Sequence, residues 1–336
     1  MPLGEWWLRG LEVEVVDANG SVPLTEVYLH HVAFYDGSAG VDMCGGANLD
    51  SRDSLWDVGA ESRGTRTMFP DGYGYPVTNE STWTANIHLI RSEGALNVKR
   101  CIECANPDGG GGSEDVCADG SRCAANTSVP SKDYFVSYTV YYDREPTSPV
   151  TYRTLDATAC QLEFNVPAAC PWSFHHAGLT AGSTQFKGMG LTGTGFYWPF
   201  DFLLDPLEDL PAHCVATRAW TVRWDQNDGR LVFGKGHLHI GAIDMSLYRL
   251  RANQTNELLC RVVPTYGAVN NWPGRQTPGD EKGYVVGISN CDLAFQDEPY
   301  LRHGDLLRVE ARYRQQPWYD GVMALFDIAV ADDDSD

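Results

Sequence analysis

Eight segments of this chain have the residue pattern of β-strands, and this pattern limits the possible folds more than any other feature. Each segment is rich in β-branched and aromatic residues, most alternate apolar with polar positions, and turns rich in Gly, Pro, Asp and Asn separate them. Nothing in the sequence has the apolar period of a long helix. The sequence therefore predicts an all-β protein built from antiparallel sheets. The eight segments are residues 11–17, 25–36, 84–91, 134–143, 216–225, 244–251, 283–289 and 305–313.

The domain organisation follows from the length of the chain and from one change in composition. A chain of 336 residues is long enough for two domains that each bury a core. A stretch rich in Pro and Ala near residue 160 is the candidate boundary. We expect two tandem antiparallel β-sandwich (jelly-roll-like) domains, residues 1–159 and 160–332, followed by an acidic tail, residues 333–336. The strand-like residues 5–16 could pair with an exposed edge of a neighbouring copy, which makes self-assembly in a filament possible.

The charge of the chain excludes one class of partner. It has 45 acidic and 25 basic residues, a formal net charge of −20, whereas nucleic-acid binding depends on a basic surface. No apolar run approaches the roughly 20 residues of a membrane-spanning helix. The first ten residues lack the basic start and apolar run of a secretory signal, so we expect that the natural leader is not part of this sequence.

Cysteines and glycosylation sequons point to the secretory route. Ten cysteines, an even number, suit an oxidising compartment. Asn-X-Ser/Thr sequons, each in a polar and turn-like stretch, predict N-linked glycans. We therefore expect a secreted, extracellular glycoprotein. The sequons begin at Asn19, Asn79, Asn126 and Asn253.

The cysteines also suggest local cross-links. Four of them surround the run Gly109–Gly112, and two disulfides would hold this glycine-rich loop together. A structural zinc ion is the alternative, because the loop begins with a C-x2-C pair. Cys260 and Cys291 are candidates for a bridge between neighbouring elements of the C-terminal half. The four loop cysteines are Cys101, Cys104, Cys117 and Cys123.

Three histidine motifs stand out. His237 and His239, in GKGHLHIGAI, would project from the same face of a strand, which is a geometry for metal binding. The adjacent His30 and His31 could reach one metal only where the strand bulges. His88 lies in a third apolar strand. Taken singly, each is as well explained as a surface histidine or as a buried one that is hydrogen-bonded to the backbone.

Other residues complete this inventory. Met323, on a strand near the C-terminus, has core packing as its default role. The remaining histidines have no partner motif, and we expect structural or solvated roles for them. They are His175, His176, His213 and His303.

Taken together, the order HH, His, HxH and Met resembles the copper type II, ascorbate-dependent monooxygenases, of the peptidylglycine α-hydroxylating and dopamine β types. Three stretches carry the resemblance: PDGYGYPVTNESTWTANIHLI, GHLHIGA, and HGDLLRVEARY followed by YDGVMALF. The chain is also similar to the family called stress up-regulated Nod 19. That similarity lies in PLTEVYLHH, VGAESRGT, the Cys-rich glycine loop and GYVVGIS.

The resemblance to the monooxygenases implies two copper sites. One would use His30, His31 and His88, and the other would use His237, His239 and Met323. Imidazole and thioether ligands suit a redox copper better than zinc or calcium. In that family the copper with the methionine ligand activates dioxygen beside a substrate C–H bond, and the other passes on an electron supplied by ascorbate.

The resemblance also suggests where the substrate would bind. A basic residue two positions before the HxH motif holds the substrate carboxylate in the peptide-processing members, and Lys235 occupies this position here. Lysine keeps the charge of arginine but lacks its bidentate geometry. Leu325 and Asp327 replace polar and tyrosine positions of those members. The expected substrate is therefore a small-molecule or peptide-like compound of unidentified structure.

Two functions from different classes remain open. The first is a secreted copper monooxygenase that hydroxylates a C–H bond with O2 and a reductant such as ascorbate. The second is a non-catalytic extracellular glycoprotein of a wall, matrix or fibre that reuses the same scaffold. Because one fold can serve both, the metal has to decide between them.

Overall fold

The computed structural model is almost entirely β-structure. Its described part contains 19 strands and, as the one helical element of that part, a short 3-10 helix, η1 (Ala60–Arg63). No helix of the described part is long and apolar enough to cross a membrane. The expected all-β class is confirmed. The structure describes residues 4–36, 54–91, 93, 130–145, 147–159, 161–166, 214–252, 255–267, 281, 283–293, 299–315 and 319–332.

All eight strands expected from the sequence are present. In β18 the alternating pattern corresponds to one buried and one more exposed face, whereas β3, β12 and β15 are buried on both faces over most of their length. The eight strands are β1 (Trp6–Asp17), β3 (Val27–Asp36), β6 (Trp83–Arg91), β7 (Phe135–Asp143), β10 (Val215–Arg223), β12 (Ala242–Leu250), β15 (Val285–Ile288) and β18 (Leu306–Arg314).

The strands outside these eight segments are mostly short, interrupted by proline, or buried on both faces, and two of them, β11 and β19, are the strands expected at the HxH motif and at Met323. Pro149 lies at the start of β8, and the apolar run of β19 has no alternation because both of its faces are covered. The remaining strands are β2 (Gly20–Ser21), β4 (Ser54–Val58), β5 (Tyr73–Val77), β8 (Ser148–Asp156), β9 (Glu163–Val166), β11 (Gly229–Leu238), β13 (Glu257–Val262), β14 (Pro264–Tyr266), β16 (Cys291–Asp292), β17 (Tyr300–Leu301) and β19 (Tyr319–Asp332).

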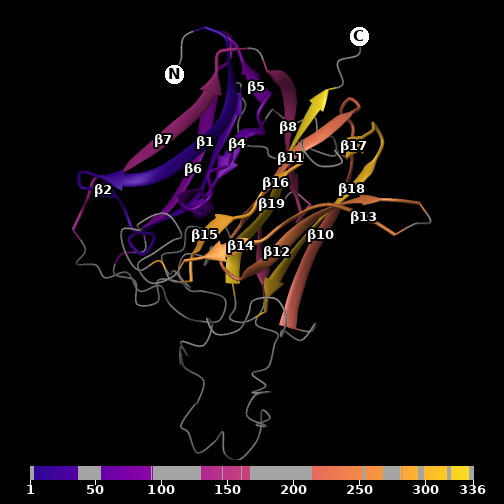
Figure 1. The fold of residues 1–336 in the computed structure, drawn as a ribbon. Coiled ribbons are helices and arrows are strands. Elements are labelled where there is room, and N and C mark those ends of the chain that lie inside the picture. Colours follow the sequence, from indigo (N-terminus) through magenta and orange to yellow (C-terminus); the bar gives the residue numbers. More distant parts are fainter. Residues whose placement is uncertain are drawn as a thin grey trace, which may run out of the picture.

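One large sheet joins the two halves of the chain. Its main path runs β16-β11-β19-β8-β5-β1-β2, and β7, β9 and β17 pair alongside. Strand β19 pairs with β11 on one side and with β8 on the other. Figure 1 shows β11 and β19 between the indigo and purple N-terminal strands and the orange C-terminal ones. The predicted boundary at residues 159/160 falls just after β8, so it separates strands that lie in one continuous sheet.

Two hydrophobic cores lie against this sheet. A three-stranded sheet, β4-β3-β6, contributes to one core, and a four-stranded sheet, β10-β18-β12-β13, contributes to the other. Strand β19 serves both cores, because Ile328 and Val330 belong to the C-terminal core while Ala329 and Ala331 belong to the N-terminal one. The central strands β11 and β19 therefore have one face towards each half of the protein.

Strand β1 is paired within its own chain. Trp7 to Val16 align with β7, and Trp6 to Leu8 align with β5. The backbone oxygen of Val13 accepts a hydrogen bond from Ser62 Oγ. These pairings use most of one edge of β1 and part of the other inside the molecule, and pairing of residues 5–16 with a neighbouring copy stays a prediction.

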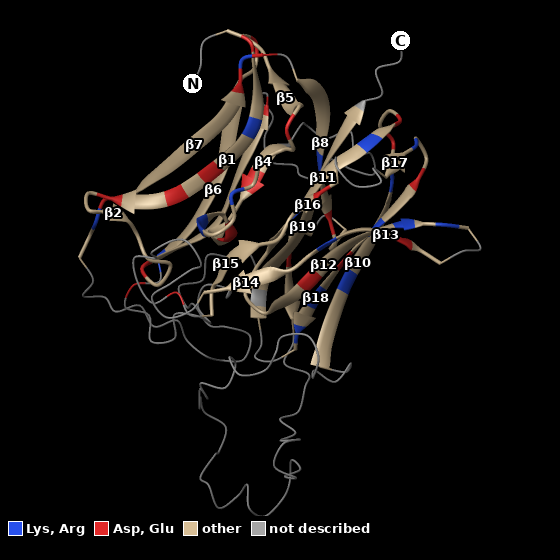
Figure 2. Ribbon diagram, in the orientation of Figure 1, with Lys and Arg blue, Asp and Glu red and all other residues tan. Residues whose placement is uncertain are grey.

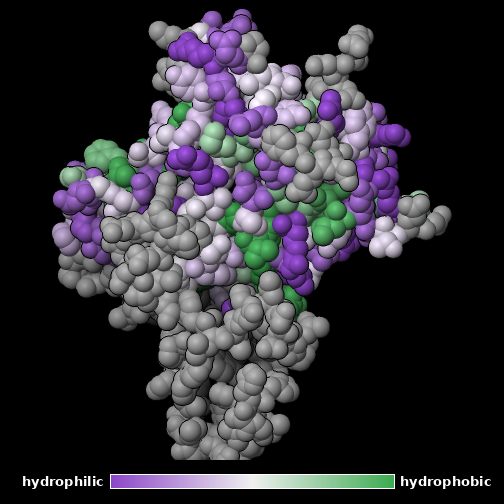
Figure 3. Space-filling view, in the orientation of Figure 1, coloured by the Kyte–Doolittle hydropathy of each residue, from purple (hydrophilic) through white to green (hydrophobic). Residues whose placement is uncertain are grey.

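Most of the large apolar side chains that are exposed lie on strands at the margins of the sheets. Figure 3 shows hydrophobic residues on one face of the molecule as separate small groups among hydrophilic ones. Strands β6, β10 and β13 are at the ends of their sheets, and β7 pairs only with β1 in the described part. The exposed residues on these four strands include Ile87, Phe135, Trp220 and Leu258.

Candidate metal centre

A β-bulge brings the first three histidines together. Strands β3 and β6 pair Leu29 with Leu89 and then His31 with His88, so His30 is an extra residue in β3. The bulge lets both adjacent histidines approach His88, as the sequence requires if they are to share a metal. Ring nitrogens of the three residues all lie within 4.8 Å of one another. We call His30, His31 and His88 the β3–β6 group.

The HxH motif forms the second group at the end of β11, with His237 on the strand and His239 directly after it. His237 and His239 project from the same side of the chain, and their Nε2 atoms lie 3.1 Å apart. Leu238, between them, belongs to the C-terminal core on the opposite side. The alternation of a strand therefore turns both imidazoles away from that core. We call His237 and His239 the β11 group.

The two groups meet to form one cluster. The rings of His30 and His239 have centroids 4.2 Å apart, the same separation as between His30 and His88. His30, His237 and His239 are 2%, 1% and 0% exposed, whereas His31 and His88 are only partly buried. Five histidines from three strands thus form a continuous group that reaches the surface on the β3–β6 side.

Met323 lies on the histidine side of β19. Its neighbours Val322 and Ala324 belong to the C-terminal core, so Met323 faces the other way. Strand β19 pairs Leu325 with His237 and Ala324 with Leu238, and Met323 follows next to His239. Tyr313 connects the two residues, because its hydroxyl donates to the Met323 carbonyl and accepts the backbone N–H of His239. This position agrees with the role that the resemblance assigns to Met323.

Hydrogen bonds select which nitrogen of each ring faces the cluster. Nε2 of His31 lies 2.9 Å from the Asn86 side-chain oxygen, and its Nδ1 lies 3.1 Å from Nδ1 of His30. Nδ1 of His237 lies 2.9 Å from a carboxylate oxygen of Glu61. The His31 ring thus directs Nδ1 into the cluster, and the His237 ring directs Nε2 into it.

Glu61 is a site residue that the sequence argument missed. It lies on η1, is buried, and accepts the backbone N–H of Gly59 as well as contacting His237. A side chain at Gly59 would meet His237 Cε1 at 2.4 Å and the His30 carbonyl at 2.8 Å. In the sequence, Glu61 lies in the stretch VGAESRGT, which carries part of the similarity to the Nod 19 family. Nothing in that stretch indicates that Glu61 contacts a histidine.

Burial and mutual repulsion keep most of the histidines neutral. Burial lowers the pKa of His30 and His239 well below the ordinary value, and the neighbouring histidines lower both further. Burial, with His237 nearby, lowers the pKa of His31 to about 4, and burial lowers that of His88. These rings therefore keep lone pairs available at neutral pH.

His237 behaves differently from the other four histidines. Burial alone would lower its pKa, but the charge of Glu61 and the hydrogen bond to it outweigh burial, and the pKa is raised. A carboxylate at the outer nitrogen of a metal-binding imidazole fixes the ring orientation and increases its basicity. Glu61 therefore gives His237 the support expected for a ligand.

The donor set fits a transition metal. Two nitrogens that bind one metal at about 2.0–2.1 Å are roughly 3.3 Å apart in a tetrahedral site. The His30–His31 and His237–His239 nitrogen pairs are each separated by 3.1 Å. Neutral imidazoles, together with the thioether ligand that the resemblance implies, suit copper better than calcium or magnesium, which prefer oxygen ligands.

Lys235, the expected substrate contact, lies in a buried ion cluster on the same face of β11. It is 4% exposed, and its ammonium group lies 2.9 Å from Asp57 Oδ1 and 2.7 Å from Asp327 Oδ2. It also donates to the Asp57 carbonyl. We call Lys235, Asp57 and Asp327 the lysine cluster. The carbonyl and the carboxylate of Asp57 accept two hydrogen bonds from the ammonium group, and Asp327 forms an ion pair with it, so a substrate carboxylate would have to displace these groups. The substrate role of Lys235 stays a prediction.

The pKa values of the two carboxyl groups of the lysine cluster are shifted in opposite directions. Burial raises the pKa of Asp327 well above the ordinary value, and the charge of Asp57 raises it further. Burial also opposes ionisation of Asp57, but the charge of Lys235 lowers its pKa overall. Burial alone would lower the pKa of Lys235, yet the two carboxyl groups raise it.

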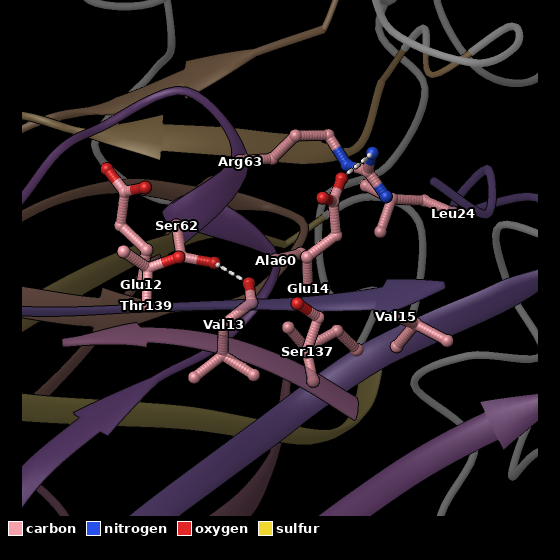
Figure 4. Close-up of a pocket in the computed structure, with 11 residues that line it drawn as sticks. Glu12, Val13, Glu14, Val15, Leu24, Ala60, Ser62, Arg63, Ser137 and Thr139 are labelled. Atoms are coloured by element: carbon pink, nitrogen blue, oxygen red, sulfur yellow. Dashed lines mark hydrogen bonds and ion pairs between the residues drawn. The ribbon is translucent and has the colours of Figure 1, made fainter. Parts of the chain in front are cut away.

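A small cavity lies behind η1, away from the candidate ligands. Its volume is about 90 Å³, below the range of about 300–1,000 Å³ for ligand pockets. Figure 4 shows Ser62 hydrogen-bonded to Val13 and Arg63 paired with Glu14. Glu12, on the same acidic strand β1 (Figure 2), pairs with Arg66. These pairings leave the cavity ill-suited as a substrate site.

The remaining predicted sites have mixed outcomes. Cys260 and Cys291 form a disulfide with Cα atoms 6.0 Å apart, which confirms that bridge. Asn19 and Asn79 lie in exposed turns, where glycans can be attached, and their modification stays a prediction. His303 is exposed, as expected for a solvated histidine. The predictions that lie outside the described residues concern Asn126, Asn253, Cys101, Cys104, Cys117, Cys123, His175, His176 and His213.

The fold and the site define an all-β protein with a histidine cluster between two sheets. Residues 206–333 match the model of the family described as stress up-regulated Nod 19, so this C-terminal part of the chain is similar to that family. The match includes β11 with its HxH motif and β19 with Met323, while β3 and β6 lie outside it. No curated protein matches the chain.

Proposed function

We propose that this chain is a secreted, copper-dependent, monooxygenase-like glycoprotein of two β-sandwich units. The observation that carries the proposal is the cluster of five histidines from β3, β6 and the end of β11, with Met323 on the adjacent strand β19. His30, His31 and His88 would hold one copper ion, and His237, His239 and Met323 would hold a second. The disulfide between Cys260 and Cys291 is compatible with an oxidising, extracellular compartment.

The chemistry assigned to the copper is redox chemistry. Bound copper would supply electron transfer and dioxygen activation for hydroxylation of a substrate C–H bond, with ascorbate as a possible reductant. The chain's own residues supply orientation. Glu61 fixes the ring of His237, Asn86 fixes that of His31, and Tyr313 ties the backbone of His239 to that of Met323.

The two histidine groups differ in their access to solvent, and this difference supports different roles for them. His31 and His88 are partly exposed, so a reductant can approach the β3–β6 group from solvent. The β11 group is sealed by η1 and β19, which excludes water from its surroundings. Any substrate pathway to the β11 group therefore requires η1 or the neighbouring backbone to move.

The proposal is tested by loading the full chain with Cu(II) and adding ascorbate under oxygen. We expect ascorbate-dependent loss of the Cu(II) resonance spectrum and uptake of oxygen, both abolished in His31→Ala. The control is His303→Ala, which removes an exposed histidine outside the cluster and should leave both signals unchanged. A copper-loaded chain that ascorbate does not reduce would refute the redox role.

One observation favours the second candidate, a non-catalytic extracellular structural glycoprotein. Large apolar side chains are exposed on the marginal strands β6, β7, β10 and β13, and such edges can pair with other chains. On this account the buried histidines serve the packing of two sheets. Sedimentation of the purified chain distinguishes the candidates, because a fibre subunit should assemble with concentration whether or not copper is present.

A further inference from the structure

The lysine cluster contains the components of an amide bond between side chains. Its amine and its two carboxyl groups are each at most 5% exposed. The ammonium nitrogen of Lys235 contacts one oxygen of each carboxyl group, at 2.9 Å for Asp57 and 2.7 Å for Asp327. The cluster therefore places one amine in contact with two carboxyl groups, away from water.

We propose that Lys235 and Asp57 form an intramolecular isopeptide bond, with Asp327 as the acid–base group that promotes it. The bond would join Nζ of Lys235 on β11 to Cγ of Asp57 on β4. These residues are 178 positions apart and belong to different sheets, whereas Lys235 and Asp327 are direct partners on β11 and β19. The product would be a covalent link between the two sheets.

The reaction is a condensation that needs no oxidant or reductant. The Nζ–Cγ bond forms and one Cγ–O bond of Asp57 breaks. The departing oxygen takes two of the three ammonium protons and leaves as water, and the third proton remains on the amide nitrogen. Asp327 relays a proton from the nitrogen to the departing oxygen and ends in its starting state, so atoms and charge balance.

The surroundings favour this reaction over a permanent ion pair. The Trp56 ring centroid lies 5.3 Å from the Lys235 nitrogen, and Tyr152 stacks on Trp56, so aromatic rings limit the access of water. Burial of charges has a large desolvation cost, which a neutral amide removes. Fixed contact between reacting groups can correspond to effective concentrations of about 10⁵–10⁸ M. Exclusion of water also opposes hydrolysis of the product.

A second lysine in the chain provides an internal comparison. Lys132 also contacts two carboxylates, Glu26 at 2.7 Å and Glu93 at 3.0 Å. Its side chain is 36% exposed, and both carboxylates are partly open to solvent. Lys235 and Lys132 therefore make similar contacts with carboxyl groups, but only Lys235 is buried. If burial drives condensation, Lys132 should remain a free amine.

The test is peptide mapping of the purified, full-length chain by tandem mass spectrometry after reduction and digestion. We expect the peptides containing Lys235 and Asp57 as one branched species, lighter than their sum by one water molecule, with Lys132 unmodified in the same digest. Recovery of both peptides only as separate linear species would overturn the proposal. A link from Lys235 to Asp327 would contradict the assigned roles. No variant has to fold for this result.

The role of Asp327 has its own test. Asp327→Asn keeps the size of the side chain and leaves Lys235 and Asp57 in place, but removes the acid. We expect the branched peptide to fall to a minor fraction of the wild-type yield. The matched control is Glu281→Gln, at another fully buried carboxylate outside the lysine cluster, which should retain the link. An undiminished yield in Asp327→Asn would contradict its acid–base role. These readouts do not involve copper, so they are independent of the proposed function.

Discussion

The two histidine groups differ in how their surroundings prepare them for a metal. The β3–β6 group depends on a bulge at His30, reaches solvent at His31 and His88, and has no carboxylate among its recorded ring contacts. The β11 group is fully buried and has Glu61 at its outer nitrogen. The β-bulge in β3 therefore fixes the positions of the ligands in the β3–β6 group, and the hydrogen-bonded carboxylate of Glu61 does so in the β11 group. Variants that act on one group alone test whether this distinction is real.

Loss of His239 should have the largest effect, because its ring lies between the groups and contacts both His30 and His237. In His239→Ala we expect the loss of one copper ion. The affinity of the β11 group for copper should fall by more than about 10–100-fold, which is the effect of losing a hydrogen-bond partner of a ligand. Titration with a competing Cu(I) chelator measures this. Retention of wild-type affinity would show that the β11 group binds no copper.

Glu61→Gln should weaken copper binding by about 10–100-fold at the β11 group and leave the β3–β6 group unchanged. Glutamine preserves the size of the side chain but removes the charge that faces His237. Glu281→Gln is the matched control, since Glu281 is buried and pairs with Arg63, and its recorded contacts include no histidine. An equal loss of copper affinity in both variants would mean that Glu61 affects copper binding only by stabilising the fold.

Acid should destabilise the metal-free chain. Burial lowers the pKa of the β3–β6 histidines and of His239 below 6.5, to about 4 for His31, so the unfolded chain binds more protons in this range. Their stabilisation is complete above about pH 6.5 and is lost as pH falls towards their folded values. His237 has a raised pKa and acts oppositely, since its stabilisation is present below 6.5 and is lost as pH rises through the folded value.

Four histidines have a lowered pKa and one has a raised pKa. The free energy of unfolding should therefore fall as the pH is lowered from about 7 to about 4. Urea unfolding across this range measures it. His31→Gln should flatten the dependence, and Glu61→Gln should steepen it by removing the support of His237. A free energy of unfolding that increases on acidification would reverse the assignment of the two groups.

Removal of the disulfide should have the smallest effect on copper binding. The Cys260–Cys291 bridge lies behind β11, with the Cys260 sulfur 3.2 Å from the position of a β-carbon at Gly234. Its sequence separation of 31 residues suggests roughly 4 kcal/mol of stabilisation. In Cys260→Ser/Cys291→Ser we expect that loss in chemical unfolding with copper stoichiometry unchanged. Loss of copper from the folded double variant would show that the bridge helps to shape the β11 group.

The sequence was informative where a residue pattern reports directly on local geometry. Alternation identified eight strands, and the HxH spacing placed His237 and His239 on one face. The adjacent His30 and His31 required a bulge, and the structure contains it. Met323 follows the same logic, since its side of β19 is fixed by the alternation of its neighbours.

The residues missed by the sequence are those whose partners are distant along the chain. Glu61 meets His237 across 176 residues, and Asp57 meets Lys235 across 178. Carboxylates are frequent in this acidic chain, and periodicity does not single out the buried ones. The ion-pairing of Lys235 depends on the packing of β4 against β11 and β19, which local patterns do not encode.

The most direct test of the copper proposal is elemental analysis of copper in chain purified from its native source, with His237→Ala as the control. The account predicts about two copper ions per chain and loss of one in the control. Absence of copper, even after reconstitution with Cu(I), would contradict the account and leave the histidine cluster as part of a structural core.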